Sequence, residues 1–467
     1  MKTCAVGFSA GLCAVLLGCE APEAPSCPTE QGLPVFPGAE GFGTTTPAGR
    51  GGAVIEVTSL DDAGPGTLRE AVAAKGPRIV VFRVGGTITL RSHLEVIEPF
   101  LTIAGQTAPG DGILVRSAGV VVFTHDVLIQ HLRFRPGIDS PINPEDNDAI
   151  AILGKTGDQD GARDVVIDHV SASWGEDELV STFFGPTRVT VSWSIVAEAL
   201  DKARHEKGGH SAGLLVAAGS SCVSVHHNLL AHNGFRNPLV QGGGLTDVVN
   251  NVVYDWGDLA TEITPVTRLT HVNIVGNTYL PGPSTPAGGP REILVEGDHP
   301  INHFGQPWSI LSPAGEAWMF VRDNRGPHRP SDGADDWSLV DPGPDGPHPA
   351  ERFDVAPVTT LPAQGAREEV LAKAGATAPR RDPVDARIVG EVRDGSGSII
   401  DTPDEVGGFP SLLGGEPPVD TDHDGMPDAW ESARGLSPTD PSDSAGDDDD
   451  DGYTNIEEYL HELLPAP

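Results

Sequence analysis

The sequence predicts an all-β protein, a parallel β-helix followed by a small acidic module, and three observations support this fold class. Six apolar runs recur with starts separated by 38, 24, 34, 23 and 26 residues, a basic unit near 24 residues with insertions. Most runs begin with an alternating V-x-I/V pattern, and a period of two indicates strands. Asn228, Asn251 and Asn277 fall at the same place in successive runs, where their amides can form a hydrogen-bonded ladder. The six runs are VLIQHLRF (127–134), VVIDHVSA (165–172), VTVSWSIV (189–196), VSVHHNLL (223–230), TDVVNNVV (246–253) and VNIVGNTY (272–279).

Repeats of this length are typical of solenoids, in which no single unit can bury its own apolar face. Strands stacked one repeat above the next form a parallel β-helix. A β-propeller is the alternative, but its blades need about 40 residues and four strands each. The 58 glycines and 42 prolines favour many turns over a helical bundle.

The N-terminal residues 1–18 predict a signal peptide, because a positive start precedes an apolar stretch too short to span a bilayer. The stretch ends in LLGC (16–19), which resembles the lipobox of bacterial lipoproteins. The resemblance implies cleavage before Cys19 and lipidation of its thiol, so that the chain would touch a membrane only through the lipid. An ordinary signal peptide cut nearby is the alternative. We expect residues 19–34 to act as a spacer.

Two cysteines, Cys27 and Cys222, remain outside the predicted signal and lipidation segment. An exported chain meets an oxidising compartment, which permits a disulfide between them. The spacing alone does not establish that bond.

The main domain is predicted to run from residue 35 to 415. Its β-helical part carries one good helix candidate, Gly66 to Val72. Residues 325–415 are rich in turn-forming residues and contain one helix candidate, around Arg367 to Ala374. We interpret this part as an irregular segment wrapped on the solenoid, with a linker as the alternative. Residues 416–467 form the acidic module.

Six motifs of the main domain carry a family resemblance. They are FPGAEGFG (36–43), VTSLDDAGPGTLREAV (57–72), EDNDAI (145–150), IDHVSASWGEDELVS (167–181), HEKGGHSAG (205–213) and HHNLLAHNGFRNP (226–238). Together they resemble a pectate lyase of polysaccharide lyase family 1. This resemblance implies a right-handed parallel β-helix that cleaves α-1,4-linked polygalacturonate by β-elimination. It also implies that calcium bridges enzyme carboxylates and substrate uronate, and that an arginine takes the C5 proton.

The acidic motifs predict a calcium site. Asp146 and Asp148 stand two residues apart, so on a strand both would point to one face, as a hard cation requires. By similarity, Asp148 matches a calcium ligand of the family, Asp146 its neighbour and Asp177 the second acidic ligand. The third ligand, usually Asp, is Ser181 here, and we expect Glu178 or the substrate to supply the missing oxygen. A solvated acidic loop is the alternative.

The two predicted catalytic residues are cations. Arg236 occupies the family's base position, although a guanidinium normally keeps its proton. Calcium on the uronate carboxylate would acidify the C5 proton and so reduce what the base must do. Lys207 matches the substrate-binding lysine, and Gln241 stands where many members carry a second arginine. The alternatives are an arginine that pairs with carboxylates between coils and a solvated surface lysine.

Four histidines lie in the same motifs, namely His210, His226, His227 and His232. Their spacing matches no common zinc pattern. We expect His226 and His227 to be structural and His210 to face the groove.

The net charge of −37 excludes nucleic acid as a partner, because phosphate binding needs a basic face. A polyanionic substrate would also be repelled, unless divalent cations bridge it to the protein. Polygalacturonate or pectin is the expected partner, and we expect a monomer.

The acidic module contains two loops with the spacing of calcium-binding loops. The resemblance is to EF-hand or thrombospondin-type-3 repeats, in which glycine permits the sharp turn and the last acid is bidentate. The alternatives are a disordered acidic tail and a dockerin-like adhesion role. The first loop places Asp420, Asp422, Asp424, Asp428 and Glu431 at ligand positions, and the second places Asp447, Asp449, Asp451 and Glu458.

These observations predict a secreted or outer-membrane-anchored bacterial lipoprotein with calcium-dependent pectate lyase activity. A lyase for methylated pectin would need no calcium, and the retained acids argue against it. A hydrolase on the same fold would need paired acids and no arginine base. From another class, Ser181 and Gln241 favour a catalytically inactive polysaccharide-binding protein.

Overall fold

The computed structural model describes residues 27, 31–155, 161–266, 269–296, 315–341 and 348–464. The predicted signal peptide and the lipidation site Cys19 lie outside the described residues. In the part of the chain that the structure describes, no helix is long and apolar enough to cross a membrane.

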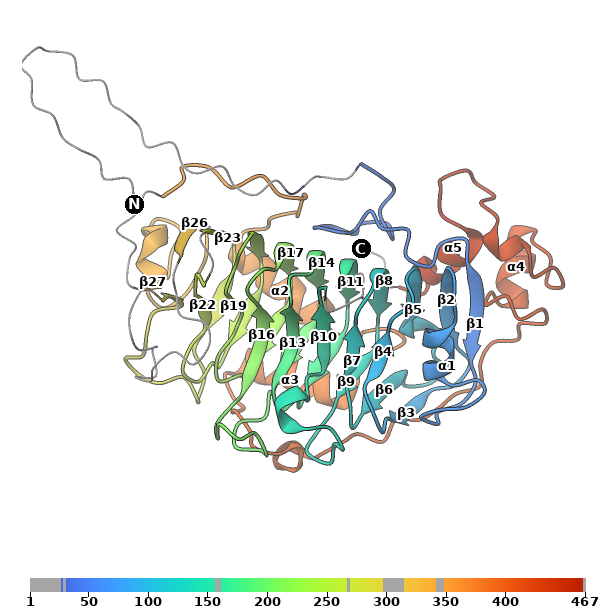
Figure 1. Ribbon diagram of the computed structural model, residues 1–467, viewed down its shortest axis with the longest axis horizontal. Coiled ribbons are helices and arrows are strands. Elements are labelled where there is room, and N and C mark those ends of the chain that lie inside the picture. Colours follow the sequence, from blue (N-terminus) through green and yellow to red (C-terminus); the bar gives the residue numbers. More distant parts are fainter. Residues whose placement is uncertain are drawn as a thin grey trace, which may run out of the picture.

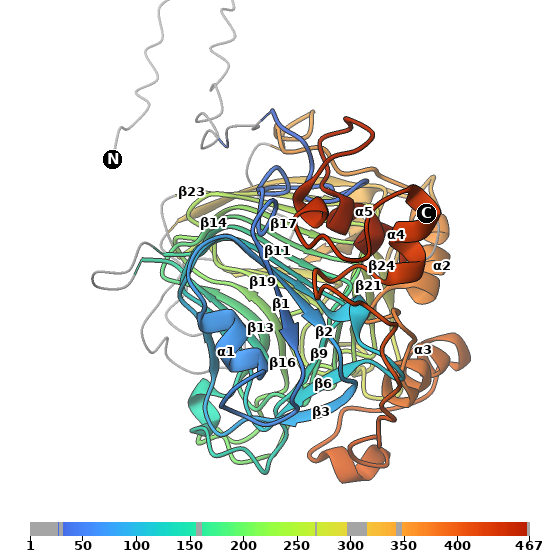
Figure 2. The ribbon, with the colours of Figure 1, turned by 90° about the vertical axis from the view of Figure 1, so that its right-hand side faces the viewer.

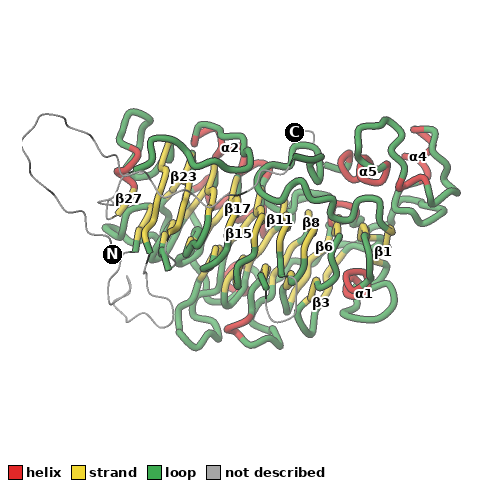
Figure 3. Tube along the Cα trace, turned by 45° about the horizontal axis from the view of Figure 1, so that its top comes forward, coloured by secondary structure: helices red, strands yellow, loops and turns green. Residues whose placement is uncertain are grey.

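Strands stack coil upon coil into three sheets, and every strand pair between named strands is parallel (Figures 1 and 3). This arrangement confirms the predicted all-β parallel β-helix. Sheet 1 contains β1 (Ala53–Val57), β2 (Arg78–Phe82), β5 (Leu101–Ala104), β8 (His125–Gln130), β11 (Arg163–Asp168), β14 (Thr187–Ser192), β17 (Ser221–His226), β20 (Leu245–Val249), β23 (Leu269–Val275) and β26 (Glu316–Arg322). Sheet 2 contains β4 (Leu94–Val96), β7 (Val120–Val122), β10 (Ile150–Leu153), β13 (Glu178–Phe183), β16 (Ala212–Val216), β19 (Leu239–Val240), β22 (Thr261–Ile263), β25 (Ile293–Val295) and β27 (Val340–Asp341). Sheet 3 contains β3 (Gly86–Thr89), β6 (Ile113–Arg116), β9 (Arg133–Arg135), β12 (Ser171–Ser173), β15 (Ile195–Ala197), β18 (Leu229–Ala231), β21 (Val252–Tyr254) and β24 (Thr278–Leu280).

The core consists of apolar columns inside the coils. Because parallel strands pair in register, one inward position of sheet 1 repeats from coil to coil, and β-branched side chains suit such a pleated surface. The column reads Ile103, Ile129, Ile167, Val191, Val225, Val248, Ile274 and Val321.

The predicted asparagine ladder is present at the bend between sheets 1 and 3, and it is one residue longer than expected. Asn228 Nδ2 donates to Asn251 Oδ1 (3.0 Å), and Asn251 Nδ2 donates to Asn277 Oδ1 (3.0 Å). Asn277 continues to Asn324 (2.9 Å), which no repeat had marked in the sequence. Each oxygen also accepts the backbone N–H of the preceding asparagine. These buried amides are therefore satisfied by the coil above and the coil below.

An aromatic column runs beside this ladder. His131, His169, Trp193 and His227 have φ between 46° and 54° and stack with ring centroids 5.0, 6.0 and 4.4 Å apart. Left-handed backbone is rare for such residues, and here one of them occupies the turn of each coil. His227 therefore has the structural place expected of it, and the buried His226 contacts the carbonyl of Glu40 through Nε2 (3.1 Å).

A short helix lies at the β1 end of the solenoid (Figure 2). This helix, α1 (Leu68–Ala73), matches the candidate at 66–72, and the Thr67 side chain caps it by accepting from Glu70 N. Leu68 and Val72 are buried in the same core as the first coils.

Two helices lie in the region after the coils, where the sequence suggested one. The helix α2 (Ala363–Lys373) overlaps the expected candidate, and α3 (Pro383–Asp394) was missed. Its signals were nevertheless present: Asp382 caps the N-terminus, Pro383 opens the helix and Gly395 ends it with φ 68°. The buried residues of both helices pack against sheet 3, in a cluster that includes Ile195, Leu229, Val252, Val370, Leu371, Ile388 and Val392.

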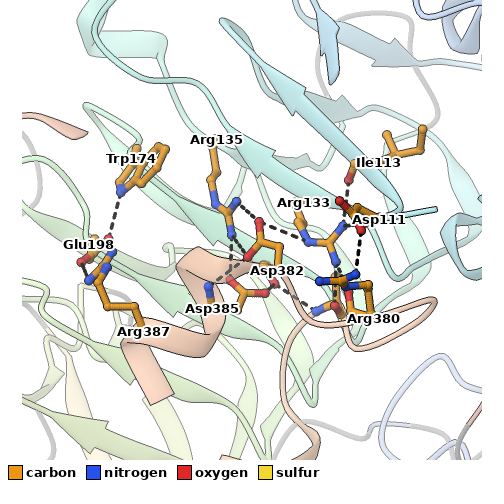
Figure 4. Close-up of polar contacts among 12 residues, drawn as sticks. Asp111, Ile113, Arg133, Arg135, Trp174, Glu198, Arg380, Asp382, Asp385 and Arg387 are labelled. Atoms are coloured by element: carbon orange, nitrogen blue, oxygen red, sulfur yellow. Dashed lines mark hydrogen bonds and ion pairs between the residues drawn. The ribbon is translucent and has the colours of Figure 1, made fainter. Parts of the chain in front are cut away.

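A buried ion-pair network fixes α3 to sheet 3 (Figure 4). Arg135 contacts Asp382 at 2.5 Å and Asp385 at 2.7 Å, and all three side chains are fully buried. Nearby, Arg387 pairs with Glu198 at 2.7 Å. Removing one partner of a buried pair leaves an uncompensated charge, so these contacts hold the position of the helix closely.

The structure contains the disulfide Cys27–Cys222, which the sequence had left open. It ties the N-terminal segment to β17 in sheet 1. Phe42, Leu245 and Ala356 are buried with Cys222 in one apolar cluster.

We expect Asn251→Ala to lower the free energy of unfolding by about 3 kcal/mol, because it removes the acceptor of the buried Asn228 backbone N–H and the amide that donates to Asn277 Oδ1. Denaturant unfolding would measure the loss. The exposed Asn143 makes one long contact, 3.4 Å to Asp146 Oδ2, and Asn143→Ala is the matched control. Equal losses in the two variants would contradict a special role for the ladder.

Candidate active site

Three carboxylates meet at the edge of sheet 2 where β10 and β13 begin. Asp148 precedes β10, Asp177 precedes β13 and Glu178 is the first residue of β13. They adjoin because β10 and β13 pair in parallel, and each offers an oxygen within 4.8 Å of the others. Three carboxylates this close repel one another unless a cation is shared.

Asp148 is the buried member of this cluster. Its Oδ1 accepts from Glu178 N (3.1 Å), and its Oδ2 accepts from the hydroxyl of Ser181. Burial, followed by the charge of Asp177, raises the pKa of Asp148 well above its usual range. The residue that replaces the expected third ligand therefore serves as a neutral hydrogen-bond donor to Asp148. The donor set fits a hard cation through Asp148, Asp177 and Glu178.

The expectation that Asp146 and Asp148 share one face of a strand is wrong. Pro144 begins a 3-10 turn, Pro144–Asp146, and the strand starts only at Ile150. Asp146 is exposed and lies outside the group of carboxylates that approach within 4.8 Å. The proline set the local backbone, so two-residue spacing did not place the two carboxylates side by side.

Arg236 lies on the turn before β19 and forms an ion pair with Glu178. Its backbone is left-handed (φ 61°), and its guanidinium lies 5.2 Å from the centre of the Phe235 ring. Burial lowers the pKa of Arg236, while Asp177, Glu262 and Asp148 act in the opposite direction. The predicted base and the predicted metal cluster are thus in direct contact, through Glu178.

Buried amides hold the turn that carries Arg236. Asn233 Nδ2 donates to Asn237 Oδ1 (3.0 Å), and Asn237 N donates to Ala260 O (3.0 Å). A Cβ on Gly213 would lie 2.6 Å from the Arg236 carbonyl, so only glycine allows this approach.

A histidine pair contacts Asp177 from the loop between β15 and β16. His210 Nε2 lies 2.9 Å from Asp177 Oδ1, and the rings of His205 and His210 stack at 3.9 Å. His205 Nδ1 accepts from Lys207 N (3.2 Å), so in the neutral ring Nε2 carries the proton and faces Asp177 (3.5 Å) and Glu145 (3.1 Å). These rings orient Asp177, a role that the contiguous motif HEKGGH did not reveal.

Lys207 itself is exposed on this loop, beside His205. Its ammonium is therefore open to an external anion.

A second contact that sequence reasoning missed anchors the same loop. Glu176 is fully buried and accepts from Asn147 Nδ2 (2.8 Å) and Arg204 Nε (2.8 Å). The contact ties the lysine-bearing loop to the residues just before Asp148.

The side-chain Oε1 of Gln241 accepts from Ala218 N (3.4 Å). The neighbouring acid on the next strand is Glu262, whose pKa burial raises to about 7. This flank of the site is thus less cationic than the family pattern implies.

The acidic module brings most of its predicted ligands together. Burial and neighbouring acids raise the pKa of both Asp424 and Glu431 to about 7. Asp428 faces elsewhere, because its oxygens accept from the backbone and hydroxyl of Thr421 (2.7 Å each). The clustered sets are Asp420, Asp422 and Asp424; Asp424, Glu431 and Asp443; and Asp447, Asp449 and Asp451.

Burial, followed by the charges of the nearby Asp449 and Asp451, raises the pKa of Glu458. Asp443 was not predicted, because it stands between the two loops and outside both spacing patterns.

Curated relatives cover nearly the whole chain. "Probable pectate lyase C" of Aspergillus terreus is 33% identical over 447 residues, which cover 94% of this chain and 96% of the relative. The protein of the same name from Emericella nidulans is 34% identical over 449 residues, covering 94% and 95%. No family model matches the chain. These relatives are fungal, which does not fit the expectation of a bacterial lipoprotein.

Solved structures show a weaker likeness. The cedar pollen allergen jun a 1 gives a TM-score of 0.49 at 19% identity, over 72% of this chain and 92% of that one. The pectate lyase Bsp165PelA from Bacillus sp. N165, in complex with trigalacturonate, gives 0.45 at 16% identity, over 72% and 98%. Because these scores are low, the relationship rests on the sequence relatives.

We expect Ser181→Asp to make the protein more responsive to calcium. The new carboxylate beside Asp148 adds repulsion without a cation and a ligand with one, since calcium affinity follows ligand charge. The rise in Tm on adding calcium should exceed that of the unmodified protein by roughly 2 °C. Ser181→Asn is the matched control without charge. The loops of the acidic module are the same in all three proteins, and an equal rise in all three would count against a cation at Asp148.

Proposed function

Because the chain belongs to the pectate lyase family, we propose that it cleaves α-1,4-polygalacturonate by calcium-dependent β-elimination and releases unsaturated oligogalacturonides. The observation that carries the proposal is the meeting of Asp148, Asp177 and Glu178 with Arg236 at one edge of sheet 2. Carboxylates alone would indicate a metal site, and an arginine alone a structural ion pair. Their contact supports the assignment of Arg236 as a base that acts next to a cation-binding group of carboxylates.

Asp148, Asp177 and Glu178 would hold the calcium. When bound, calcium supplies neutralisation of the uronate carboxylate, and this acidifies the adjacent C5 proton. His205 and His210 keep Asp177 directed toward the cluster, and the Ser181 hydroxyl keeps Asp148 in place.

Arg236 is the proposed base. The proton leaves C5 for the guanidine, the C4–O4 bond breaks, a C4–C5 double bond forms, and the departing O4 takes a proton. Burial lowers the pKa of Arg236, and a lower pKa increases the fraction of neutral guanidine that can accept the proton. Glu178 would also pair less closely with the guanidinium when it holds a cation, so both effects favour a less firmly protonated arginine.

Lys207 is proposed to bind a uronate carboxylate of the substrate. Its exposed ammonium stands on the loop that His205 and Glu176 anchor next to the acidic cluster. A positive charge there also favours the enolate-like charge that develops as C5 loses its proton.

Two substitutions support the second candidate function, a surface polysaccharide-binding protein with weak or no catalysis. Ser181 removes one carboxylate from the family's calcium set, and Gln241 removes one cation from the substrate side. A lyase for methylated pectin is the third reading, and the retained acidic cluster counts against it.

Export to an oxidising compartment is proposed as well. The disulfide Cys27–Cys222 supports it, because such bonds persist mainly outside the reducing cytosol. A lipid on Cys19 remains a proposal of the sequence motif alone.

The test is incubation with polygalacturonate, with and without chelator, while the ultraviolet absorbance of the unsaturated product is followed. We expect absorbance to rise with calcium and to stop after thorough chelation. Binding without any rise, across several pH values, would leave the polysaccharide-binding function. A rise that survives chelation would remove calcium from the mechanism.

Arg236→Lys should lower kcat by at least about 1000-fold while substrate binding persists, because the ammonium cannot reproduce the position of the guanidine. The exposed Arg91 offers the matched control, Arg91→Lys, which should retain full activity. Substantial activity in Arg236→Lys would move the base elsewhere.

A further inference from the structure

Residues 420–464 of the acidic module, called the terminal module below, lie on the outer face of the first coils of the solenoid (Figures 1 and 2). Its two helices are α4 (Asp428–Arg434) and α5 (Asn455–Glu462). A dedicated apolar cluster joins the module to β2 and to the end of β5, and it consists of Ile79, Val81 and Ala104 with Met426, Ile456, Tyr459 and Leu460. The apolar face of the module is therefore used within the chain, which leaves little of it for an adhesion partner.

Polar contacts surround this apolar cluster. Arg50 Nε lies 2.9 Å from Glu457 Oε1, and His423 Nδ1 lies 2.9 Å from Glu56 Oε2. Arg83 lies between β1 and the first acidic loop, 3.2 Å from Glu56 and 3.6 Å from Asp420.

The first acidic loop touches β1 directly. Gly425 has φ 93°, and a Cβ there would lie 2.9 Å from Val54 Cγ1 and 3.1 Å from Ile456 Cδ1. The loop therefore sits between the first strand of sheet 1 and the last helix of the chain.

Several carboxylate oxygens at this loop are buried without hydrogen-bond partners in the described part of the chain. Both oxygens of Glu431, which has no exposed surface, lack a partner within the described residues, as do both oxygens of Asp422. One oxygen each of Asp424 and Asp443 is in the same condition. Buried acceptors without donors are costly, and an oxygen-binding cation is the ligand that satisfies them.

The net charge of the module also favours a bound cation. Residues 416–467 contain 16 acidic side chains and one basic side chain, Arg434. Without a bound cation, repulsion among these acids opposes the compact loop that packs on β1.

The second loop differs, although it shares four of the acidic positions of the first loop. Asp447, Asp449 and Asp451 are exposed, and solvent can satisfy their carboxylates. The two loops are thus unequal in what a cation would contribute to folding.

We propose that Asp420, Asp422, Asp424, Glu431 and Asp443 form one calcium site, and that its ion clasps the terminal module to the first coils of the solenoid. Asp443 takes the part that the loop pattern had given to Asp428, which instead holds Thr421. The ion closes the loop around Gly425, and the closed loop presents Met426 to Ile79 and Val81. The clasp is structural and does not depend on lyase activity.

Hydrogen exchange of the full-length protein, with and without calcium, tests the clasp. Calcium should slow exchange at least about tenfold in the amides of β2, which the module covers. Glu431→Gln and Asp443→Asn should each abolish most of that protection and lower Tm in calcium. Asp449→Asn, in the exposed loop, and Asp428→Asn are the matched controls and should keep it.

Two outcomes would overturn the proposal. If calcium protects residues 420–464 but leaves β2 unchanged, the ion binds without clasping. If Asp449→Asn loses as much protection as Asp443→Asn, the first loop is not the site. Polygalacturonate cleavage, measured on the same variants below their Tm with saturating calcium, should be unchanged, so failure of the clasp and failure of the lyase function are told apart.

Discussion

Register between neighbouring coils is the constraint on which the whole molecule depends. Backbone hydrogen bonds run from coil to coil, so each side chain rests on the equivalent side chain of the coils before and after it. Such a column suits side chains that make favourable contacts with copies of the same residue type. Branched aliphatic residues do so by packing, asparagine by being both donor and acceptor, and aromatic rings by stacking.

The same constraint explains why the candidate site is acidic and crowded. Asp148 and Asp177 come from adjacent coils at the same edge, so register places like charges side by side. Elsewhere the fold would exclude such a pair, and here a cation is the simplest compensation. The turn that carries Arg236 reaches the cluster from two strands further along sheet 2, because Asn233 and Asn237 fix its path.

Much of the architecture could be predicted because repetition is visible in one dimension. The strand runs and three of the ladder asparagines recur at a regular spacing, which could be recognised in the sequence. Asn324 was not predicted, because a long insertion separates it from the previous repeat. The spacing of Asp146 and Asp148 misled because Pro144 imposes a turn where a strand was assumed. The spacing of two residues predicts the relative direction of their side chains only where the backbone between them has the assumed conformation.

Contacts across loops were beyond reach for a related reason. The approach of His205 and His210 to Asp177, of Arg204 to Glu176, and of Asp443 to the first loop depends on how separate segments meet in space. No period connects these residues. The helix α3 was missed for a different reason, because its capping residue, first proline and final glycine could all have been recognised in the sequence.

The outer cover of the first coils has a consequence for the order of folding. Ile79 and Val81 are shielded by Met426 and Leu460, which are synthesised more than 300 residues later. During synthesis the first coils therefore present an uncovered apolar surface, and their completion waits for the late part of the chain. Such long-range closure slows folding and leaves a period in which that surface is open to aggregation.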